Sequence, residues 1–235
     1  MKSHFHISVT YLKHFSRDPS KGRKSIVHVF NKKRQIEQCL PVNKIGIKTG
    51  VFGDSIEKFN QIFEARYNDF MDLRTIRYPT NITVERLKNG MMMLFNFIFR
   101  TRIMYEYIRK SYRNYPDLIR MYGADPWHSE NAVPMIFFEL LLKRTYPISI
   151  RGYKNDVFIT GDNPVVIFRH PYGFCTVFLL PLDRRHIFCL GYYLKEEQLK
   201  FADIYLNKVE IITENVNEWI RIQAETHYIK MNPLC

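Results

Sequence analysis

The stretch Phe158-Ile159-Thr160-Gly161-Asp162-Asn163-Pro164-Val165-Val166 decides how the second half of the chain is organised. Apolar residues on both sides predict one buried strand that enters and another that leaves. Between them stand a glycine, a carboxylate, an amide and a proline, which are the residues of a turn. Such a turn can present Asp162 and Asn163 at the edge of a sheet. The alternative is that Asp162 only caps its own turn through a side-chain hydrogen bond.

Outward from this turn, the pattern of the chain changes twice. Residues 5–11 and 25–30 look like short strands, with a loop signal at 18–22 and a basic turn at 31–34. From Asp54 the apolar spacing becomes helical. We expect helices from 54 to about 70, from 83 to about 113 and from 132 to 143, with breaks at Pro116 and 123–126. Beyond Pro147 we expect strands at 157–160, 164–169, 174–181, 186–192 and 209–213, a helix at 214–225 and a short tail.

This order of elements predicts an α+β fold in a single domain, residues 1–235. Its sub-regions are a basic, β-rich part (1–53), a central helical bundle (54–146) and a mostly antiparallel sheet with a closing helix (147–235). No apolar run reaches the roughly 18 residues that span a bilayer, and the N-terminus lacks the order of a signal peptide. Four widely spaced cysteines suggest reduced thiols. We therefore expect a cytoplasmic protein without a membrane partner.

Positive charge is concentrated at the front of the chain. The net charge is +12, and residues 1–50 alone hold 11 Lys and Arg against 2 Asp and Glu. Residues 155–235 hold 8 against 10. Clustered Lys and Arg are typical of proteins that bind a polyanion, because they release phosphate counterions. A solvated basic surface without a partner explains the same composition.

Several segments match, in order, one set of family motifs. The opening motif is matched by His4, Tyr11, Leu12 and Phe15, while Phe5 stands at its second His and Ser8 at its Pro. Further matches are Phe59 to Arg66 with Glu64, Phe97 to Thr101, Thr160 to Pro164 with Gly161 for a Ser, Pro181-Leu182, and Asn217, Ala224 and Tyr228. By these segments the chain resembles the functionally uncharacterised DUF4238 family, whose name implies no reaction.

The matched residues suggest one chemical site. His4, Glu64 and Asp162 form a His/carboxylate set that could serve in acid–base catalysis or hold a divalent metal such as Mg²⁺ or Mn²⁺. His6, Arg100 and Asn163 are candidate substrate-binding residues, Arg100 for a phosphate or carboxylate. In the alternative interpretation, Glu64 pairs with a basic residue such as Arg100, and both histidines are surface residues.

Two classes of function follow. The first is a nuclease that hydrolyses phosphodiesters in RNA or DNA, for which the role of a toxin or a defence effector would be suitable. The second is a non-catalytic module that binds nucleic acid or a protein through the basic N-terminal half. An enzyme acting on a small anionic metabolite is a third alternative. The substrate, the metal and the oligomeric state do not follow from the sequence.

Overall fold

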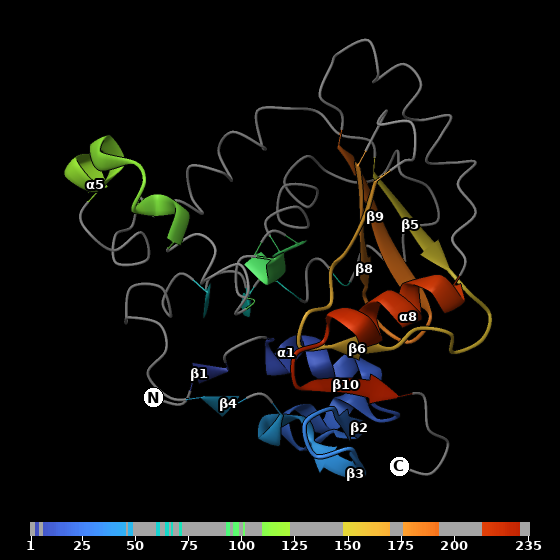
Figure 1. Cartoon of the computed structure of the whole chain (residues 1–235). Helices are drawn as coiled ribbons and strands as arrows, with labels where there is room; N and C mark the ends of the chain where they lie inside the picture. The colour runs from blue at the N-terminus through green and yellow to red at the C-terminus, as the bar shows by residue number, and fades with distance from the viewer. Residues whose placement is uncertain are drawn as a thin grey trace.

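The described part of the chain forms two four-stranded antiparallel sheets and one two-stranded pair, and the closing helix contacts strands of both larger sheets (Figure 1). The computed structural model describes residues 3–4, 7–45, 47–48, 60–61, 64–65, 67, 71, 93–94, 96–98, 101, 110–122, 148–169, 176–192 and 213–230. These residues include helices and antiparallel sheets, so the predicted α+β class is confirmed.

The first sheet joins the two ends of the chain. Its order is β3 (Ile36–Pro41), β2 (Ile26–Asn31), β10 (His227–Lys230) and β6 (Thr160–Gly161), and all neighbours are antiparallel. β2 was expected from its alternating residues, and this prediction is confirmed. The predicted tail after the closing helix is wrong, because β10 is an inner strand of the sheet. A pair of two-residue strands, β1 (Ser3–His4) and β4 (Ile47–Lys48), lies beside it.

The second sheet comes wholly from the C-terminal part. Its order is β5 (Ile148–Gly152), β9 (His186–Tyr192), β8 (Thr176–Pro181) and β7 (Val166–Arg169), again antiparallel throughout. β9 has its predicted bounds, whereas β5 was not predicted. The segment 157–159 was expected to be a strand but is not, because its backbone hydrogen-bonds to the side chain of Asn217 rather than to a neighbouring strand. Asn217 Nδ2 donates to Val157 O at 2.7 Å, and Ile159 N donates to Asn217 Oδ1 at 3.0 Å.

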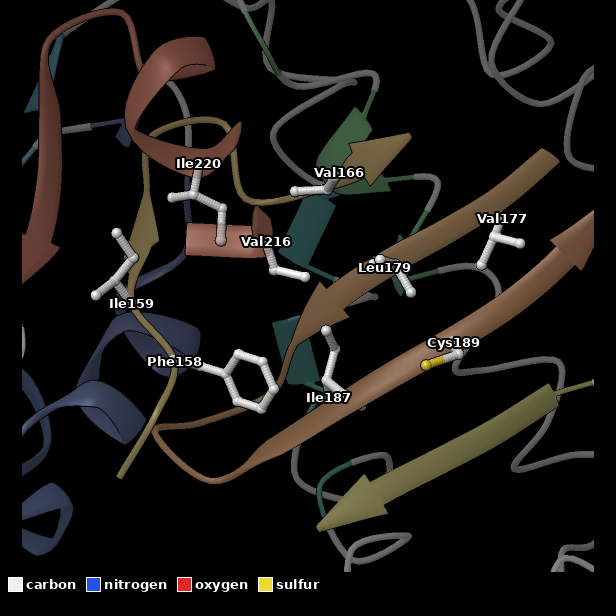
Figure 2. Close-up of a cluster of buried hydrophobic side chains, with 9 residues drawn as sticks. All are labelled: Phe158, Ile159, Val166, Val177, Leu179, Ile187, Cys189, Val216 and Ile220. Carbon is white, nitrogen blue, oxygen red and sulfur yellow. The ribbon is translucent and has the colours of Figure 1, made fainter. Parts of the chain in front are cut away.

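Helix α8 (Thr213–Gln223) covers this second sheet. Val216 and Ile220 are four residues apart, so they lie on one face of the helix, and both are buried. Figure 2 shows their side chains among those of strand residues. The other members of this core are Phe158, Ile159, Val166, Val177, Leu179, Ile187 and Cys189. The apolar face of α8 therefore fixes the helix over the sheet.

Residues 9–12 form a short helix, whereas a strand was expected at residues 5–11. Ser8 caps α1 (Val9–Leu12), because its hydroxyl accepts from Thr10 N at 3.1 Å. Two 3-10 helices follow, η1 (Lys13–Phe15) and η2 (Pro19–Lys24). The alternating residues predicted a strand, but tertiary burial of Tyr11 and Leu12 decided the local conformation.

Burial of Tyr11 ties α1 to both sheets. Its hydroxyl lies 2.8 Å from Thr160 Oγ1 in β6 and donates to Pro181 O, at the end of β8, at 2.7 Å. Its ring packs against Phe97 with centroids 4.8 Å apart. Burial raises the pKa of Tyr11, so the hydroxyl stays protonated and able to donate.

The central helical bundle lies largely outside the described residues. Those described within the first two expected helices, at 60–71 and 93–98, are helical, as are 110–112. Thr101, within the second expected helix, lies in a bend, and 132–143 is outside the description. Pro116 does break the second helix, but it also begins a new one, α5 (Pro116–Tyr122). Proline suits a first helical position, because the N–H that it lacks would have no partner there.

Two further observations concern the expected environment of the chain. Cys39 is disulfide-bonded, so the prediction of four reduced cysteines is wrong. Cys189 is a buried free thiol. Within the part of the chain that the structure describes, no helix is both long and apolar enough to cross a membrane.

The contact between α8 and the sheet can be tested at Ile220. We expect Ile220→Ala to lower the free energy of unfolding by about 2–5 kcal/mol, because a fully buried side chain would leave a cavity. Ile222→Ala is the matched control, since Ile222 is 59% exposed on the same helix, and we expect a change within about 0.5 kcal/mol. Urea titration measures both. Equal losses in the two variants would contradict the packing of α8.

Candidate functional site: an arginine-lined cleft

Asp162, the acid predicted to be catalytic, forms a clamp on a distant turn. Its carboxylate is 5% exposed. Oδ1 accepts from Glu225 N at 2.8 Å, and Oδ2 accepts from Thr226 N at 2.7 Å and His227 N at 3.0 Å. The Thr226 hydroxyl donates to Oδ2 as well. Asp162 N donates to His227 O at 3.0 Å, so the backbone takes part in the same contact.

This arrangement leaves little room for chemistry at Asp162. A carboxylate offers about four acceptor positions, and three of the four donors lie on Oδ2 while one lies on Oδ1. A base must accept a proton, and a metal ligand must donate a lone pair, so either role at Oδ2 would displace a donor of the turn between α8 and β10. These hydrogen bonds give a structural reason for burying the acid. Their donors belong to residues 225–227 and not to the turn that contains Asp162 itself.

The neighbours of Asp162 are also held by structural contacts. A Cβ on Gly161 would lie 3.2 Å from His227 O and 3.3 Å from Ala224 Cβ, which explains a glycine where β6 lies against β10 and the residue that follows α8. The predicted ligand Asn163 is half-buried, and its backbone oxygen accepts from Gln223 Nε2 at 2.7 Å. Asp162 and Asn163 therefore meet the end of α8.

The other predicted site residues are described only in part. His4 lies in β1 opposite Ile47, and its side chain is outside the described residues, as are His6 and Arg100. Glu64 is half-buried in a helical stretch. Its spacing of three from Tyr67 places the two on one face, and Tyr67 donates to Leu182 O at 3.3 Å. The convergence of His4, Glu64 and Asp162 on one site stays a prediction.

A metal centre is not formed by the described side chains. Among them, no three His, Cys, Asp or Glu residues lie close enough together to hold an ion. Because the side chains of His4 and His6 are not among those described, the predicted metal ligands His4, Glu64 and Asp162 cannot be assembled from them.

A cleft of about 410 Å³ opens elsewhere, between the N-terminal 3-10 helices and the turn that joins β8 to β9. Three arginines, one histidine, one serine and two aspartates contribute to it. Its lining residues are His14, Ser16, Arg17, Pro19, Asp156, Asp183, Arg184 and Arg185.

One carboxylate holds two of the arginines side by side. Asp156 accepts from Arg184 at 2.8 Å and from Arg185 Nε at 2.7 Å. The hydrogen bond to Asp156 raises the pKa of Arg185 further above its ordinary value. Asp183 is a second carboxylate beside them, so the excess positive charge of the cleft comes from Arg17, and the Arg185 side chain is 55% exposed.

The turn that carries these arginines is held by its own hydrogen bonds. Asp183 Oδ1 accepts from Arg185 N at 2.7 Å and from His186 N at 2.8 Å. His186 Nδ1 lies 2.9 Å from the same oxygen. Arg184 O accepts from the backbone nitrogens of Val157 and Phe158 at 2.7 and 3.0 Å. The direction of the two arginines is therefore set before any ligand binds.

The opposite wall comes from the end of η1 and the segment before η2. The Ser16 side chain is 95% buried, since it is 5% exposed, and its Oγ makes no hydrogen bond to the described chain. Arg17 is exposed and makes no ion pair within the described chain. Beyond Pro19, Lys21, Arg23 and Lys24 are exposed along η2, so the cleft opens onto a basic surface. Lys21 is the one of these three that pairs with Asp18 within the described chain, at 3.3 Å.

None of the residues that line this cleft was predicted as a site. A charged run, Asp183-Arg184-Arg185-His186, between two predicted strands was a visible signal for a hairpin turn with exposed arginines. A second signal was the run Ser16-Arg17-Asp18-Pro19. Their convergence depends on contacts between segments about 170 residues apart, which the sequence pattern does not reveal.

A hydrogen-bonded chain runs from Asp162 to the β2–β3 turn. Asn31 Oδ1 accepts from Lys33 N and Arg34 N, so its Nδ2 faces His227 Nε2 at 2.9 Å. Nε2 is then an acceptor, and the proton of His227 lies on Nδ1, which is 3.0 Å from Thr226 Oγ1. Burial lowers the pKa of His227. The nearby carboxylate of Asp162 opposes this shift, whereas the charges of Arg34 and Lys33 add to it.

Replacing Asp162 tests whether the acid is structural. We expect Asp162→Ala to lower the free energy of unfolding by on the order of 3 kcal/mol, because four donors lose their acceptor. Chemical denaturation measures this loss, with Glu218→Ala, an exposed carboxylate on α8, as the control that stays near wild type. A variant as stable as wild type would show that the clamp is dispensable and would reopen the catalytic role.

The His227 contact predicts a pH dependence of stability. When the pKa of a histidine is lower in the folded than in the unfolded state, the unfolded state takes up the proton at a higher pH. The contribution of His227 to stability is therefore complete above its unfolded-state pKa near 6.5. It falls as the pH drops through that value and levels off below the folded pKa. Urea unfolding at pH 7.5 and 5.5 should show a larger loss for wild type than for His227→Gln. Identical losses would contradict the buried, neutral histidine.

Comparison with known proteins adds no assignment. No family model, no curated protein and no solved structure matches the chain. The resemblance to the DUF4238 family therefore stays a prediction from individual residues, and the chemistry of the cleft is the basis on which a function can be inferred.

Proposed function

We propose that this protein binds nucleic acid, with the phosphate backbone held at the arginine cleft and along the basic surface of η2. The observation that supports this proposal best is the meeting of two basic segments. Arg17 and the cations of η2 come from one end of the chain, and Arg184 and Arg185 come from the other. Arg17, Arg184 and Arg185 line the cleft, and η2 begins there with Pro19.

The chemistry of these donors suits phosphate oxygens. A guanidinium group presents its N–H groups in a fixed plane that matches two oxygens of a phosphate. Arg184 and Arg185 already share Asp156, so they are positioned without the loss of side-chain entropy that a free arginine pays on binding. Arg17, Arg23 and Lys24 are exposed and available to further phosphates.

The charge of the rest of the described chain favours the same face. Residues 7–45 hold nine Lys and Arg against two Asp and Glu. The outer surface of α8 instead exposes Glu214 and Glu218. This asymmetry directs a polyanion towards the N-terminal segment, because like charges repel it from α8.

Binding is better supported than hydrolysis. The predicted nuclease requires Asp162 as an acid, a base or a metal ligand, and that carboxylate is occupied by the turn at 225–227. The roles of His4 and Glu64 rest on the sequence alone. Cleavage of the bound strand is therefore an outcome to be recorded in the binding experiment rather than the function that the geometry favours.

The salt dependence of binding tests this proposal. We expect the wild-type protein to bind fluorescent single-stranded RNA or DNA at low salt, and the logarithm of the association constant to fall linearly with that of the salt concentration. The double variant Arg184→Gln, Arg185→Gln should bind more weakly. Its slope should be smaller in magnitude by roughly 1–2, because each lost phosphate contact removes about 0.7 from the slope for a single strand. Fluorescence anisotropy measures both quantities.

Arg120→Gln is the matched control for this experiment. Arg120 is an exposed arginine on α5, which lies apart from both sheets (Figure 1). We expect the wild-type slope in this variant. Equal effects of the control and the double variant would point to general charge attraction, and the absence of RNA and DNA binding at low salt would refute the proposal.

A further inference from the structure

We propose that the arginine cleft is a pocket for a phosphate monoester, the terminal phosphate of a nucleic-acid strand. This inference rests on the proposed function, since it assigns a particular group of the nucleic acid to the cleft. The remaining phosphates would follow the basic surface of η2, outside the pocket.

Charge distinguishes a terminal phosphate from an internal one. A monoester carries about −1.5 to −2 at neutral pH and three terminal oxygens, whereas a backbone diester carries one charge and two. The cleft holds three guanidinium groups, from Arg17, Arg184 and Arg185, against the carboxylates of Asp156 and Asp183. Asp183 already receives two backbone N–H groups of its own turn. These five charged groups sum to +1, so the match to a monoester rests on its third terminal oxygen, which gives the N–H donors of the three guanidinium groups one more acceptor than a diester does.

The buried hydroxyl of Ser16 is the second observation. Ser16 is 95% buried, and its hydroxyl makes no hydrogen bond to the described chain. Such a group destabilises the folded protein, so its presence points to a partner that binds there. Ser16 lines the cleft, and its Oγ lies below the surface of the wall. A small side-chain adjustment would bring it to a phosphate oxygen, to which a hydroxyl can donate. This residue explains why the pocket would select one group rather than attract any polyanion.

The size of the cleft agrees with one nucleotide. Ligand pockets for small molecules have volumes of roughly 300–1,000 Å³, and this cleft has about 410 Å³. A duplex is far too wide to enter, so an end or a single nucleotide is the part that fits. His14 lies on the same lining, where its ring can contact a sugar or a base.

The experiment compares one single-stranded octanucleotide in three forms: with a 5′-phosphate, with a 3′-phosphate and with two hydroxyl ends. Each is labelled at the end away from the phosphate, or internally, and each is made as RNA and as DNA. Wild type should bind one phosphorylated form about tenfold more tightly than the hydroxyl form. Ser16→Ala should remove this preference.

Stability and competition complete the test. Because Ser16→Ala deletes a hydroxyl that has no hydrogen bond, its urea midpoint should equal or exceed that of wild type, so lost binding cannot be attributed to unfolding. Ser16→Thr, which keeps the hydroxyl, should retain the preference. Adenosine 5′-monophosphate as a competitor separates the two sources of a monoester. Displacement at micromolar concentration would assign the pocket to free nucleotides, and failure to displace would assign it to strand ends.

Each outcome bears on one claim. Equal affinity for the phosphorylated and hydroxyl forms, with both bound, would overturn the monoester pocket and leave the proposed function standing. Failure of every oligonucleotide to bind at low salt would overturn both. A preference that survives in Ser16→Ala but disappears in Arg184→Gln would remove Ser16 from the pocket and overturn the argument from its buried hydroxyl.

Discussion

The carboxylate of Asp162 is the constraint on which the described structure depends. It gathers the backbone N–H groups of residues 225–227 at the point where α8 gives way to β10. From the other side, the ammonium group of Lys32 donates to Arg221 O, Ile222 O and Ala224 O. An anion on the amides and a cation on the last carbonyls satisfy both sides of the turn. With this turn fixed, β10 pairs with β2, and α8 is held over the second sheet.

The same region connects the two halves of the molecule to the cleft. Tyr11 joins Thr160, two residues before Asp162, to the end of β8. The turn after β8 carries Arg184 and Arg185, and Ser16 and Arg17 follow Tyr11 in the segment between η1 and η2. The contacts of Tyr11 therefore connect the two segments that line the cleft. Many residues that resemble the DUF4238 motifs, including Tyr11, Thr160, Asp162 and Asn217, take part in these structural contacts.

The sequence predicted the elements whose patterns are local. β2 and β9 follow from their apolar residues, and α8 was placed within a residue or two of its bounds. β10 was missed because only four residues form it, one of them buried, and its partners β2 and β6 lie about 200 and about 70 residues earlier. Residues 5–11 were expected to be extended, but residues 9–12 form a helix in which Tyr11 is buried. The acid of the 160–164 turn was found, yet its four donors lie over 60 residues later, so its structural role was not visible. The arginines of the cleft were passed over because their meeting depends on the fold.

The central claim is that Asp162 builds the molecule and that nucleic acid binds at the arginine cleft. The most direct measurement is the affinity of Asp162→Asn for a single-stranded oligonucleotide, with cleavage of the strand followed in the same sample. It should be made at a temperature where circular dichroism shows that the variant is folded. We predict the wild-type affinity and the wild-type level of cleavage, whatever that level is, with a lower unfolding midpoint. A folded Asp162→Asn variant that had lost binding or cleavage would contradict the account and would indicate that Asp162 takes part in binding or catalysis.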